Sequence, residues 1–425
     1  MANAFSKEER VAFENLLEGF QDALVLSRNV SIYNTDSTMM ERTNNVIWRP
    51  MPYIAQSISS TPGVSIAGSY QDMTQLSVPA TLGFSRTVPW TMTALELRDA
   101  LQENRLGDAA KQKLASDINL AIMNVAAAQG SLVVDVSGAA GDYDDVALAD
   151  SIMNEQGVVN FDRFLALSSR DYNGLAGNLA AVTRSFGNQK SDRAYERSYV
   201  GMVAGFETYK MDYANRIAAA AGGGAITIDT QAAANNYLVP SATSTALTGE
   251  TQNVDNRFQT ITVSTTVGVT AGDAFTIDGV EAVHHITKQS TGQLKTFRVV
   301  QVVDGTHLVI TPGIISNQGG TDAEAQYQNC IVTPAAAAPF TWLNVNATNI
   351  NPFWQRDALE ILPGRYAVPT DAGTAVMRAS TDQGIELVMQ KWYDINSMTT
   401  LYRLDTLFGV VNKQPEMSGI LLFNQ

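Results

Sequence analysis

The sequence predicts an α+β protein in which a small β-rich module is inserted into a larger domain of mixed helices and strands. Apolar residues recur at helical spacing near the N-terminus and again over Asp108–Gln129. β-branched runs with Asp-Gly turns fill Gly223–Val345, and Asn346–Gln425 has mixed α/β patterns. The 425 residues exceed the roughly 250–300 that one hydrophobic core serves, so two or three domains are expected.

The first predicted element is an amphipathic helix over roughly Lys7–Ser27. Ser6 and Glu9 have the spacing of a capping box. The apolar positions on one face are Val11, Leu16, Leu17, Phe20 and Leu24. Glu14 and Glu18 lie off that face. The pattern fits a helix packed on its own domain and an arm docked on a partner equally well.

The segment from Val46 to Trp90 has a different character, with five prolines, many Ser and Thr residues and little charge. Proline spacing excludes a long helix. Met73–Val78 and Thr81–Val88 alternate in polarity and are predicted to form two long antiparallel strands. A long loop without a core of its own is usually functional or supported by a partner.

Helical periodicity returns at Thr93, which opens a second capping box with Glu96. Gly107 is expected to interrupt this helix, and Asp108 to cap another that ends before Gly130. Its apolar stripe is Leu114, Ile118, Ile122 and Val125. A helix over Asp108–Gln129 would be about 33 Å long at ~1.5 Å per residue.

Beyond this helix, Leu132–Val136 is predicted to be a buried strand. Helices and loops alternate from Asp144 to Ala221, with a turn at Asp171–Gly174 and a flexible boundary at Ala221–Ala225. The strands expected in the inserted module are Phe258–Val263, Asp273–Ile277, Val280–Ile286, Phe297–Gln301, Leu308–Thr311, Gln328–Val332 and Thr341–Val345. Asp278-Gly279 and Asp304-Gly305 are predicted hairpin turns, because glycine accepts positive φ. Short strands at this spacing indicate a small barrel or sandwich.

Composition excludes several classes of protein. A formal net charge of −14 disfavours tight nucleic-acid binding, in which Lys and Arg neutralise phosphates. The single cysteine, Cys330, can form neither an intrachain disulfide nor a cysteine-based zinc site, and is expected to be a buried apolar residue. No apolar run is long enough for a membrane span, and the N-terminus lacks the features of a signal peptide.

The search for catalytic chemistry finds none, so we expect neither an enzyme nor a cofactor. There is no phosphate-binding loop and no Gly-x-Ser-x-Gly elbow. The adjacent His284 and His285 would point to opposite faces of a strand, and His307 belongs to a hairpin. The acids of "GDYDD" at Gly141–Asp145 lack the glycine and distal glutamate of a Ca²⁺ loop, and fit a solvated helix cap.

Several stretches resemble a known family. "NVDNRFQTITVSTTVGVTAGDAFTIDGV" and "FRVVQVVDGTHLVITP" resemble the inserted domain of the P22-like coat proteins of short-tailed phages. "ERTNNVIWRPMP" at Glu41, "NLAIMNVAAAQGSLVV" at Asn119 and "LNVNATNINPFWQRDALEI" at Leu343 are similar to other parts of these proteins, in the same order. The resemblance covers nearly the whole chain.

The resemblance implies the HK97 capsid fold with an inserted small β-barrel domain. The domains that it implies are an N-terminal arm (1–45), an extended E-loop (46–92), a peripheral domain with a spine helix (93–130), a first axial part (131–222), the inserted β-barrel (223–345) with a D-loop near 241–252, and a C-terminal axial and peripheral part (346–425). The central hairpins are thus explained as a module that aids folding and contact between subunits.

The function that the resemblance implies is that of a major capsid protein. Copies would assemble as hexamers and pentamers, with a scaffolding protein and a portal at one vertex, into an icosahedral procapsid with an expected triangulation number of seven. The shell would expand on maturation and enclose double-stranded DNA without sequence-specific binding. The protein would be found in the virion, and in the host cytoplasm during assembly, without membrane contact.

The resemblance also implies residues for two contacts. Glu14 and Glu18 are candidates for binding the basic helical end of the scaffold. In the D-loop, Leu247 and Glu250 are candidates for contact between subunits. Glu250 is the only charged residue of Ser241–Gln252, so a salt bridge would need a basic partner such as Lys288 or Lys295. The contact could instead be apolar through Leu247, or absent.

Two alternatives differ in class. One is an encapsulin-like or other shell protein of the same fold, which scaffold dependence and a portal vertex would distinguish. The other is a hydrolase with an inserted carbohydrate-binding module, which would need clustered acids and a row of aromatic residues. Phe258, Phe275 and Phe297 are spaced as core residues instead.

Overall fold

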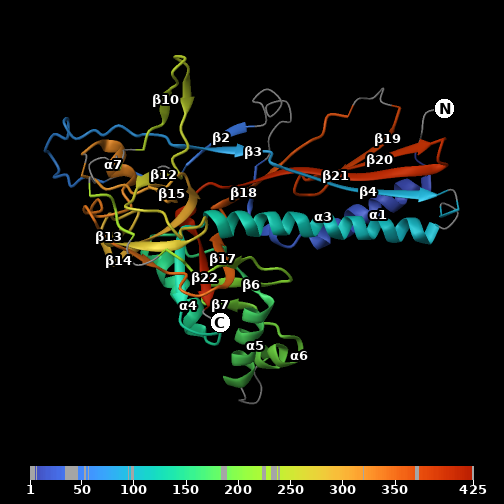
Figure 1. Ribbon diagram of the computed structural model, residues 1–425, viewed down its shortest axis with the longest axis horizontal. Coiled ribbons are helices and arrows are strands. Elements are labelled where there is room, and N and C mark those ends of the chain that lie inside the picture. Colours follow the sequence, from blue (N-terminus) through green and yellow to red (C-terminus); the bar gives the residue numbers. More distant parts are fainter. Residues whose placement is uncertain are drawn as a thin grey trace. The chain divides into compact units, whose positions relative to one another are not determined.

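The computed structural model in Figure 1 describes residues 5, 7–33, 46–51, 54–55, 57–93, 95–96, 100–182, 189–222, 226–230, 237, 240–318, 320–368 and 373–423. The chain divides into two compact units. Unit 1 comprises Met1–Ile47, Pro79–Met123 and Leu359–Val411, and unit 2 comprises Trp48–Val78, Asn124–Ala358 and Asn412–Gln425. The predicted cap at Ser6 and residues 223–225 of the predicted boundary lie outside the described residues.

Unit 1 is built on a six-stranded sheet in the order β1-β18-β21-β20-β19, with β4 also paired to β21. The strands are β1 (Ser31–Ile32), β4 (Phe84–Thr93), β18 (Leu359–Pro363), β19 (Ala375–Ser380), β20 (Glu386–Asp394) and β21 (Thr399–Asn412). β4 is antiparallel to β21 from Phe84 opposite Phe408 to Thr93 opposite Thr399. Two stacked aromatic pairs, Phe84–Phe408 and Trp90–Tyr402, reinforce this ladder.

The N-terminal helix α1 spans Lys7–Ala23 and is followed by the 3-10 helix η1 (Leu26–Asn29). The predicted buried face is correct at Leu16, Phe20 and Leu24 but wrong at Val11, which is 51% exposed while Phe13 is buried. The helix ends before Ser27 because the side chain of Asn119 hydrogen-bonds the backbone at the end of the helix. The Asn119 side chain donates to the carbonyl of Ala23 and accepts from the Leu26 amide.

The long helix α3 spans Ala100–Gln129 without interruption. The predicted break at Gly107 is wrong. A Cβ on Gly107 would lie 3.3 Å from Leu16 Cδ1, so this glycine allows α1 to approach α3 closely. The predicted end is correct, since the Gly130 amide bonds the carbonyl of Ala126. Upstream, Thr93 and Glu96 make the reciprocal bonds of the predicted capping box.

The described residues between α1 and α3 do not form the predicted antiparallel pair of long strands. Instead β3 (Ser77–Thr81) pairs with β2 (Val46–Pro50) in a two-stranded sheet, and β4 belongs to the sheet of unit 1. Between β2 and β3, the described residues 57–76 include no strand. The alternating pattern at Met73–Val78 therefore does not continue as a strand before Ser77.

Unit 2 contains a seven-stranded sheet in the order β5-β22-β17-β6-β8-β7, with β9 paired to β17. The strands are β5 (Leu132–Val136), β6 (Arg163–Ser168), β7 (Met202–Val203), β8 (Phe206–Met211), β9 (Arg216–Ile217), β17 (Thr348–Gln355) and β22 (Ser418–Phe423). β5 has the bounds predicted from the sequence. β5 is parallel to β22, and β6 is parallel to β8.

Three helices accompany this sheet: α4 (Tyr143–Glu155), α5 (Ser169–Val182) and α6 (Gln189–Arg197). α4 and α5 contribute Val146, Met153, Tyr172 and Leu175 to a core shared with Leu165 of β6 and other strand residues. The predicted turn at Asp171–Gly174 is wrong, because these residues lie inside α5. The C-terminal region is not mixed α/β: its described residues form strands and the short 3-10 helix η4 (Pro415–Met417).

The inserted module forms a five-stranded sheet in the order β12-β15-β14-β13-β16. Its elements are β12 (Gln259–Thr262), β13 (Ala274–Val283), β14 (Ser290–Val302), β15 (His307–Thr311), α7 (Asp322–Tyr327) and β16 (Phe340–Trp342), with a separate hairpin of β10 (Thr243–Thr245) and β11 (Thr251–Asn253). Phe275 stacks on Phe340 at 4.4 Å between ring centroids and packs beside Phe297 in the module's own core.

One predicted hairpin is correct and the other is wrong. β14 and β15 form the hairpin at Asp304-Gly305, but Gly305 does not have the positive φ expected of it. The carboxylate of Asp304 instead closes the turn by accepting from the amides of Thr306 and His307, each at 2.8 Å. Asp278 and Gly279 lie within the continuous strand β13, where the register with β14 shifts and Gly279 has a φ of 76°.

The predicted strand Gln328–Val332 is also absent as a strand. Cys330 makes only isolated bridges, to Ala282 and Ser316. Its thiol is fully buried, and burial raises its pKa to about 12, which agrees with the expectation of a structural cysteine.

Candidate functional site

The first candidate site is the hairpin of β10 and β11, which holds both D-loop candidates. Thr243 pairs with Asn253 and Thr245 with Thr251. All six strand residues are exposed, and the tip residue Leu247 is fully exposed. Figure 1 shows the hairpin extending away from the rest of unit 2. An isolated two-stranded hairpin is at best marginally stable in water, so this one gains little stability from its own contacts.

The tip is shaped by local hydrogen bonds. The amide of Ala246 donates to the carbonyl of Glu250, and Gly249, with a φ of 88°, donates to Ala246. Leu247 is thereby presented to solvent. The Glu250 side chain is exposed, and none of the described cations pairs with it.

The two lysines suggested as partners of Glu250 are engaged elsewhere. Lys295 is 1% exposed and pairs with Glu416 at 2.6 Å. Lys288 Nζ donates to the carbonyls of Gln326 and Gln328. Neither lysine is therefore available to Glu250 within the described part of the chain.

The second candidate surface is the outer face of α1. Glu14 and Glu18 are both exposed, one turn apart, while Phe13, Leu16 and Phe20 are buried on the opposite side. Glu9 differs from them because it contacts Lys391 Nζ and accepts from the hydroxyl of Tyr402. The two outer carboxylates therefore face solvent, as the amphipathic pattern predicted.

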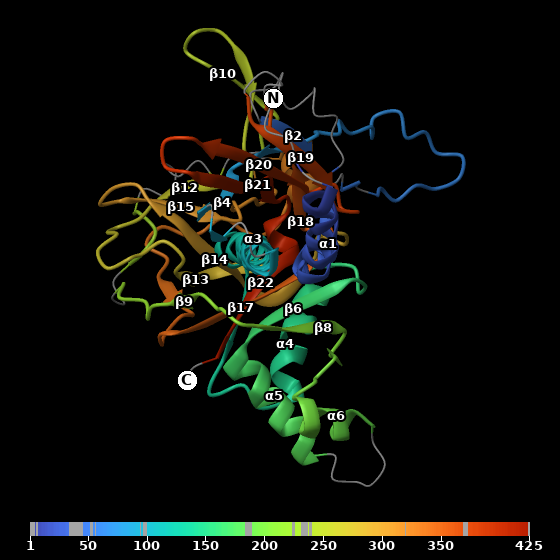
Figure 2. The same cartoon turned by 90° about the vertical axis from the view of Figure 1, so that its right-hand side faces the viewer.

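A third surface is the extended segment before β3. Its exposed large apolar residues are Ile58, Val64, Ile66, Tyr70 and Met73. In Figure 2 this segment is the blue loop that projects outward. Exposed apolar side chains on a segment without a core are typical of a surface that a partner covers.

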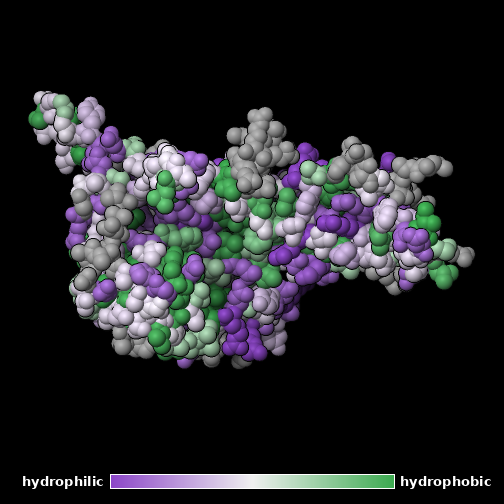
Figure 3. All heavy atoms as spheres, turned by 45° about the horizontal axis from the view of Figure 1, so that its top comes forward, coloured by the Kyte–Doolittle hydropathy of each residue, from purple (hydrophilic) through white to green (hydrophobic). Residues whose placement is uncertain are grey.

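A fourth surface, at the tip of the β20–β21 hairpin, was not predicted from the sequence. The exposed apolar residues there are Trp392, Tyr393, Ile395 and Met398, with Leu95 after the end of β4. In Figure 3 hydrophobic residues gather at the right-hand end, where Figure 1 places the ends of β4, β20 and β21. The aromatic and aliphatic residues of the run "WYDINSM" could have indicated this surface from the sequence.

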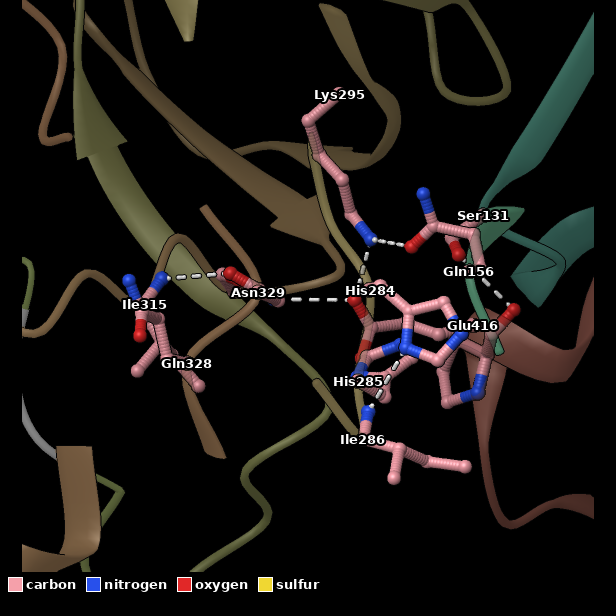
Figure 4. A network of polar contacts seen from close by, with 12 residues as sticks. Ser131, Gln156, His284, His285, Ile286, Lys295, Ile315, Gln328, Asn329 and Glu416 are labelled. Carbon is pink, nitrogen blue, oxygen red and sulfur yellow. Dashed lines mark hydrogen bonds and ion pairs between the residues drawn. The ribbon is translucent and has the colours of Figure 1, made fainter. Parts of the chain in front are cut away.

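A buried charge cluster joins the inserted module to the seven-stranded part of unit 2 (Figure 4). Lys295 of β14 donates to Glu416 of η4 at 2.6 Å and to the side chain of Gln156, which follows α4, at 3.0 Å. Asn329 also donates to Glu416, at 3.1 Å. Although burial alone would raise the pKa of Glu416, these neighbours hold it well below its ordinary value.

His285 belongs to the same cluster and is neutral near pH 7. Its Nε2 lies 3.3 Å from Glu416 without making a hydrogen bond. Burial lowers its pKa to about 4, and the positive charge of Lys295 opposes protonation while Glu416 favours it. His284 beside it packs against Gly157, where a Cβ would come within 2.8 Å of the ring.

A second buried contact fastens the module to the C-terminal end of α3. Arg298 of β14 is 1% exposed and donates to the carbonyl of Ala127 at 2.7 Å. A cation at this position satisfies carbonyls that have no partner within the helix and complements its dipole. Burial lowers the pKa of Arg298 to about 10, so it remains charged.

The buried charge cluster lies between packed elements, and no group of His, Cys, Asp and Glu among the described residues could hold a metal ion. A cavity of about 260 Å³ in unit 1, lined by Phe13, Trp90 and Met389 among others, contains no histidine or cysteine. None of the described helices is both long enough and apolar enough to cross a bilayer.

Comparison with protein families gives a match over nearly the whole chain. A family model described as "P22 coat protein - gene protein 5" matches residues 1–424. The solved "CUS-3 coat protein I-domain" is 36% identical and covers 29% of this chain and 98% of its own, with a TM-score of 0.22.

More distant likenesses cover nearly all of the chain. "Mycobacterium phage Che8" is 9% identical and covers 93% of this chain and 90% of its own, with a TM-score of 0.42. "Asymmetric unit of bacteriophage PhiM1 mature capsid" is 11% identical and covers 100% and 88%, also with a TM-score of 0.42. Likenesses this distant carry no argument about function.

Proposed function

This chain belongs to the P22 coat protein family, and we propose that its copies assemble with a scaffolding protein and a portal into the shell that encloses phage double-stranded DNA. Family membership makes it a major capsid protein, a structural protein of the bacteriophage virion that forms an icosahedral lattice with itself. It also carries the assignment of the HK97 capsid fold. The match over residues 1–424 is the observation on which the function depends.

The exposed elements of the chain support assembly with neighbouring copies. The β10–β11 hairpin, the extended segment with Ile58 to Met73 and the β20–β21 tip all present apolar side chains to solvent. Burying such surface contributes about 25 cal/mol per Å². Modest contacts repeated over many copies therefore stabilise a shell without covalent links.

The domain boundaries implied by the resemblance are part of the proposal. The arm (1–45), E-loop (46–92), peripheral part (93–130), first axial part (131–222), inserted β-barrel (223–345) and C-terminal axial and peripheral part (346–425) are assigned by family likeness. The separate aromatic core of the inserted module supports the boundary of the inserted domain. The closure of its sheet into a barrel remains a prediction.

The proposed partners follow from charge. Glu14 and Glu18 on the exposed face of α1 would bind the basic end of the scaffold, and the attraction would weaken with salt. The formal net charge of −14 suits a shell that encloses DNA without binding it tightly. We propose that assembly takes place in the host cytoplasm, without enzymatic activity or membrane contact.

Electron microscopy of the chain expressed alone and with its scaffolding protein tests the proposal. We expect uniform closed shells with scaffold, and aberrant shells or monomers without it. Regular shells without scaffold would favour the encapsulin-like alternative. Soluble monomers under both conditions would contradict an assembly role for this chain.

A further inference from the structure

The return limb of the extended segment is held by the short helix α7 of the inserted module. The amide of Asp72 donates to the carboxylate of Asp322 at 3.0 Å. Two residues later, Thr74 is bound by both Gln326 and Tyr327. The inserted module therefore contacts the segment through its backbone, just before β3.

The side chain of Gln326 hydrogen-bonds both the amide and the carbonyl of Thr74. Its side-chain oxygen accepts from the Thr74 amide at 3.0 Å, and its side-chain nitrogen donates to the Thr74 carbonyl at 3.2 Å. The hydroxyl of Tyr327 donates to the same carbonyl at 3.1 Å. Gln326 is 4% exposed and Tyr327 is 7% exposed. A buried amide in this position is costly without its partners, so the contact is favoured over an open arrangement.

The helix that carries these residues is itself fixed at both ends. Thr321 and Glu324 form a capping box at its start. At its end, Lys288 Nζ donates to the carbonyls of Gln326 and Gln328 at 2.9 and 3.1 Å. Gln326 is therefore held next to Thr74 by a helix whose two ends are fixed by hydrogen bonds, and not by a free loop.

The limb is also held on the β3 side of Thr74. The carbonyl of Leu76 accepts from the Met51 amide at 2.8 Å, and Ser77 bridges Asp255. Asp255 in turn pairs with the buried Arg257 at 2.8 Å. The return limb is therefore fastened to the module at three points, Asp72, Thr74 and Ser77.

The part of the segment beyond Asp72 has only local support among the described residues. Its amide bonds are short-range, such as Val64 to Thr61 and Ser69 to Ile66. Residues 57–71 are all exposed. Fixing the limb at Asp72 and Thr74 therefore limits the directions in which the exposed part can extend.

We propose that Gln326 and Tyr327 are positioning residues for assembly: through Thr74, the inserted module sets the direction in which the extended segment leaves unit 2 toward a neighbouring copy of this chain. This proposal rests on the proposed role of the segment in contacts between copies. It gives the inserted module a task within the subunit that is separate from its own outward contacts.

Hydrogen exchange on the unassembled chain tests the contact itself. We expect Gln326→Ala to raise exchange at the Thr74 amide roughly ten-fold, because that amide loses its acceptor. Tyr327→Phe removes only the hydroxyl and should raise it about two-fold. The matched control is Gln318→Ala, since Gln318 is exposed and contacts Thr333 within the module. Unchanged exchange at Thr74 in Gln326→Ala would overturn the proposal.

Electron microscopy with scaffold then tests the consequence. We expect Gln326→Ala to reduce the fraction of uniform closed shells at least about two-fold, with normal shells for Gln318→Ala. Faster exchange at Thr74 together with wild-type shells would overturn the positioning role. If Gln326→Ala also raises exchange throughout β13–β15, that variant has destabilised the whole module. The proposal is then tested with Tyr327→Phe, by exchange at the Thr74 amide and by the fraction of uniform closed shells. Failure of the wild type to form shells would refute the assembly function, whereas the exchange result is independent of it.

Discussion

The ammonium of Lys295 lies 2.6 Å from a carboxylate oxygen of Glu416, and the two side chains are 1% and 14% exposed. Lys295 comes from β14 of the inserted module and Glu416 from η4, beside the strand β22. These two residues, 121 positions apart, therefore join two separately formed cores of unit 2. The packing of the module against the seven-stranded part of unit 2 therefore depends on an ion pair.

Lys295→Met should destabilise the chain by about 3–5 kcal/mol, because it leaves Glu416 as a buried charge without its cation. The double variant with Glu416→Leu should recover much of the loss, since it also removes the carboxylate that Lys295→Met leaves without its cation. Urea unfolding checks both values. As a control, Lys113→Met removes an exposed pair with Asp117 and should change the stability by less than about 1 kcal/mol. An equal effect of the two single variants would argue against this assignment.

Acid should weaken the docking of the module through His285. Its pKa is lowered to about 4 in the folded chain, whereas an unfolded histidine titrates near 6.5. The unfolded state therefore binds a proton between about pH 6.5 and 4 that the folded state does not, so stability falls as pH falls across that window. Below about pH 4.5 the unfolded chain also binds a proton at Glu416 that the folded chain does not, because the folded pKa of Glu416 is lowered, and this adds to the loss.

Urea midpoints at pH 7, 6, 5 and 4 measure this dependence. The groups that face His285 are Glu416, Lys295, Lys288 and His284, and all are retained in His285→Gln. That variant should flatten the profile between pH 6.5 and 4.5. A slope unchanged by His285→Gln would mean that this histidine does not govern acid stability.

The sequence predicted elements whose signal is local and missed those set by distant partners. β5, the end of α3 and the β14–β15 hairpin follow from a buried run, a glycine and an Asp-Gly pair. Gly107 was misread as a break because its partner, Leu16, lies in another helix. Lys295 was suggested as a surface partner because nothing in its neighbourhood in the sequence indicates that Glu416 covers it.

The same limit explains the error at Gly174, and it yields a prediction within a single helix. A Cβ on Gly174 would lie 2.2 Å from the carbonyl oxygen of Ala140, whereas one on Gly177 would meet nothing within 4 Å. Gly174→Ala should therefore cost about 2–4 kcal/mol through backbone displacement. Gly177→Ala should stabilise the chain by roughly 0.5–1 kcal/mol, since alanine is the better helix former. Thermal unfolding of the two variants should shift in opposite directions.

Charge reversal on α1 tests the proposed scaffold contact. Glu14→Lys with Glu18→Lys should reduce scaffold incorporation into shells several-fold, because two favourable charges become unfavourable ones. Wild-type incorporation should itself decline as salt rises from low values to about 0.5 M. Both residues are exposed, so the monomer should unfold as the wild type does. Scaffold incorporation that is indifferent to the reversal would exclude α1 as the site.

The β10–β11 hairpin offers a test that separates an apolar contact from an ionic one. Leu247 is fully exposed at the tip, so Leu247→Asp should change the stability of the monomer by less than about 0.5 kcal/mol. If the tip packs against apolar surface of a neighbouring copy, the same change should lower the yield of closed shells several-fold. Burying an unpaired carboxylate there would be costly.

Glu250→Gln is the matched variant for an ionic contact. Since neither Lys288 nor Lys295 is available to this residue within the described chain, we expect it to assemble with the yield of the wild type and the same dependence on salt. A loss confined to Glu250→Gln, and mimicked by high salt, would instead establish a salt bridge with a cation of a neighbouring copy. Wild-type yields for both variants would remove the hairpin from the assembly contacts.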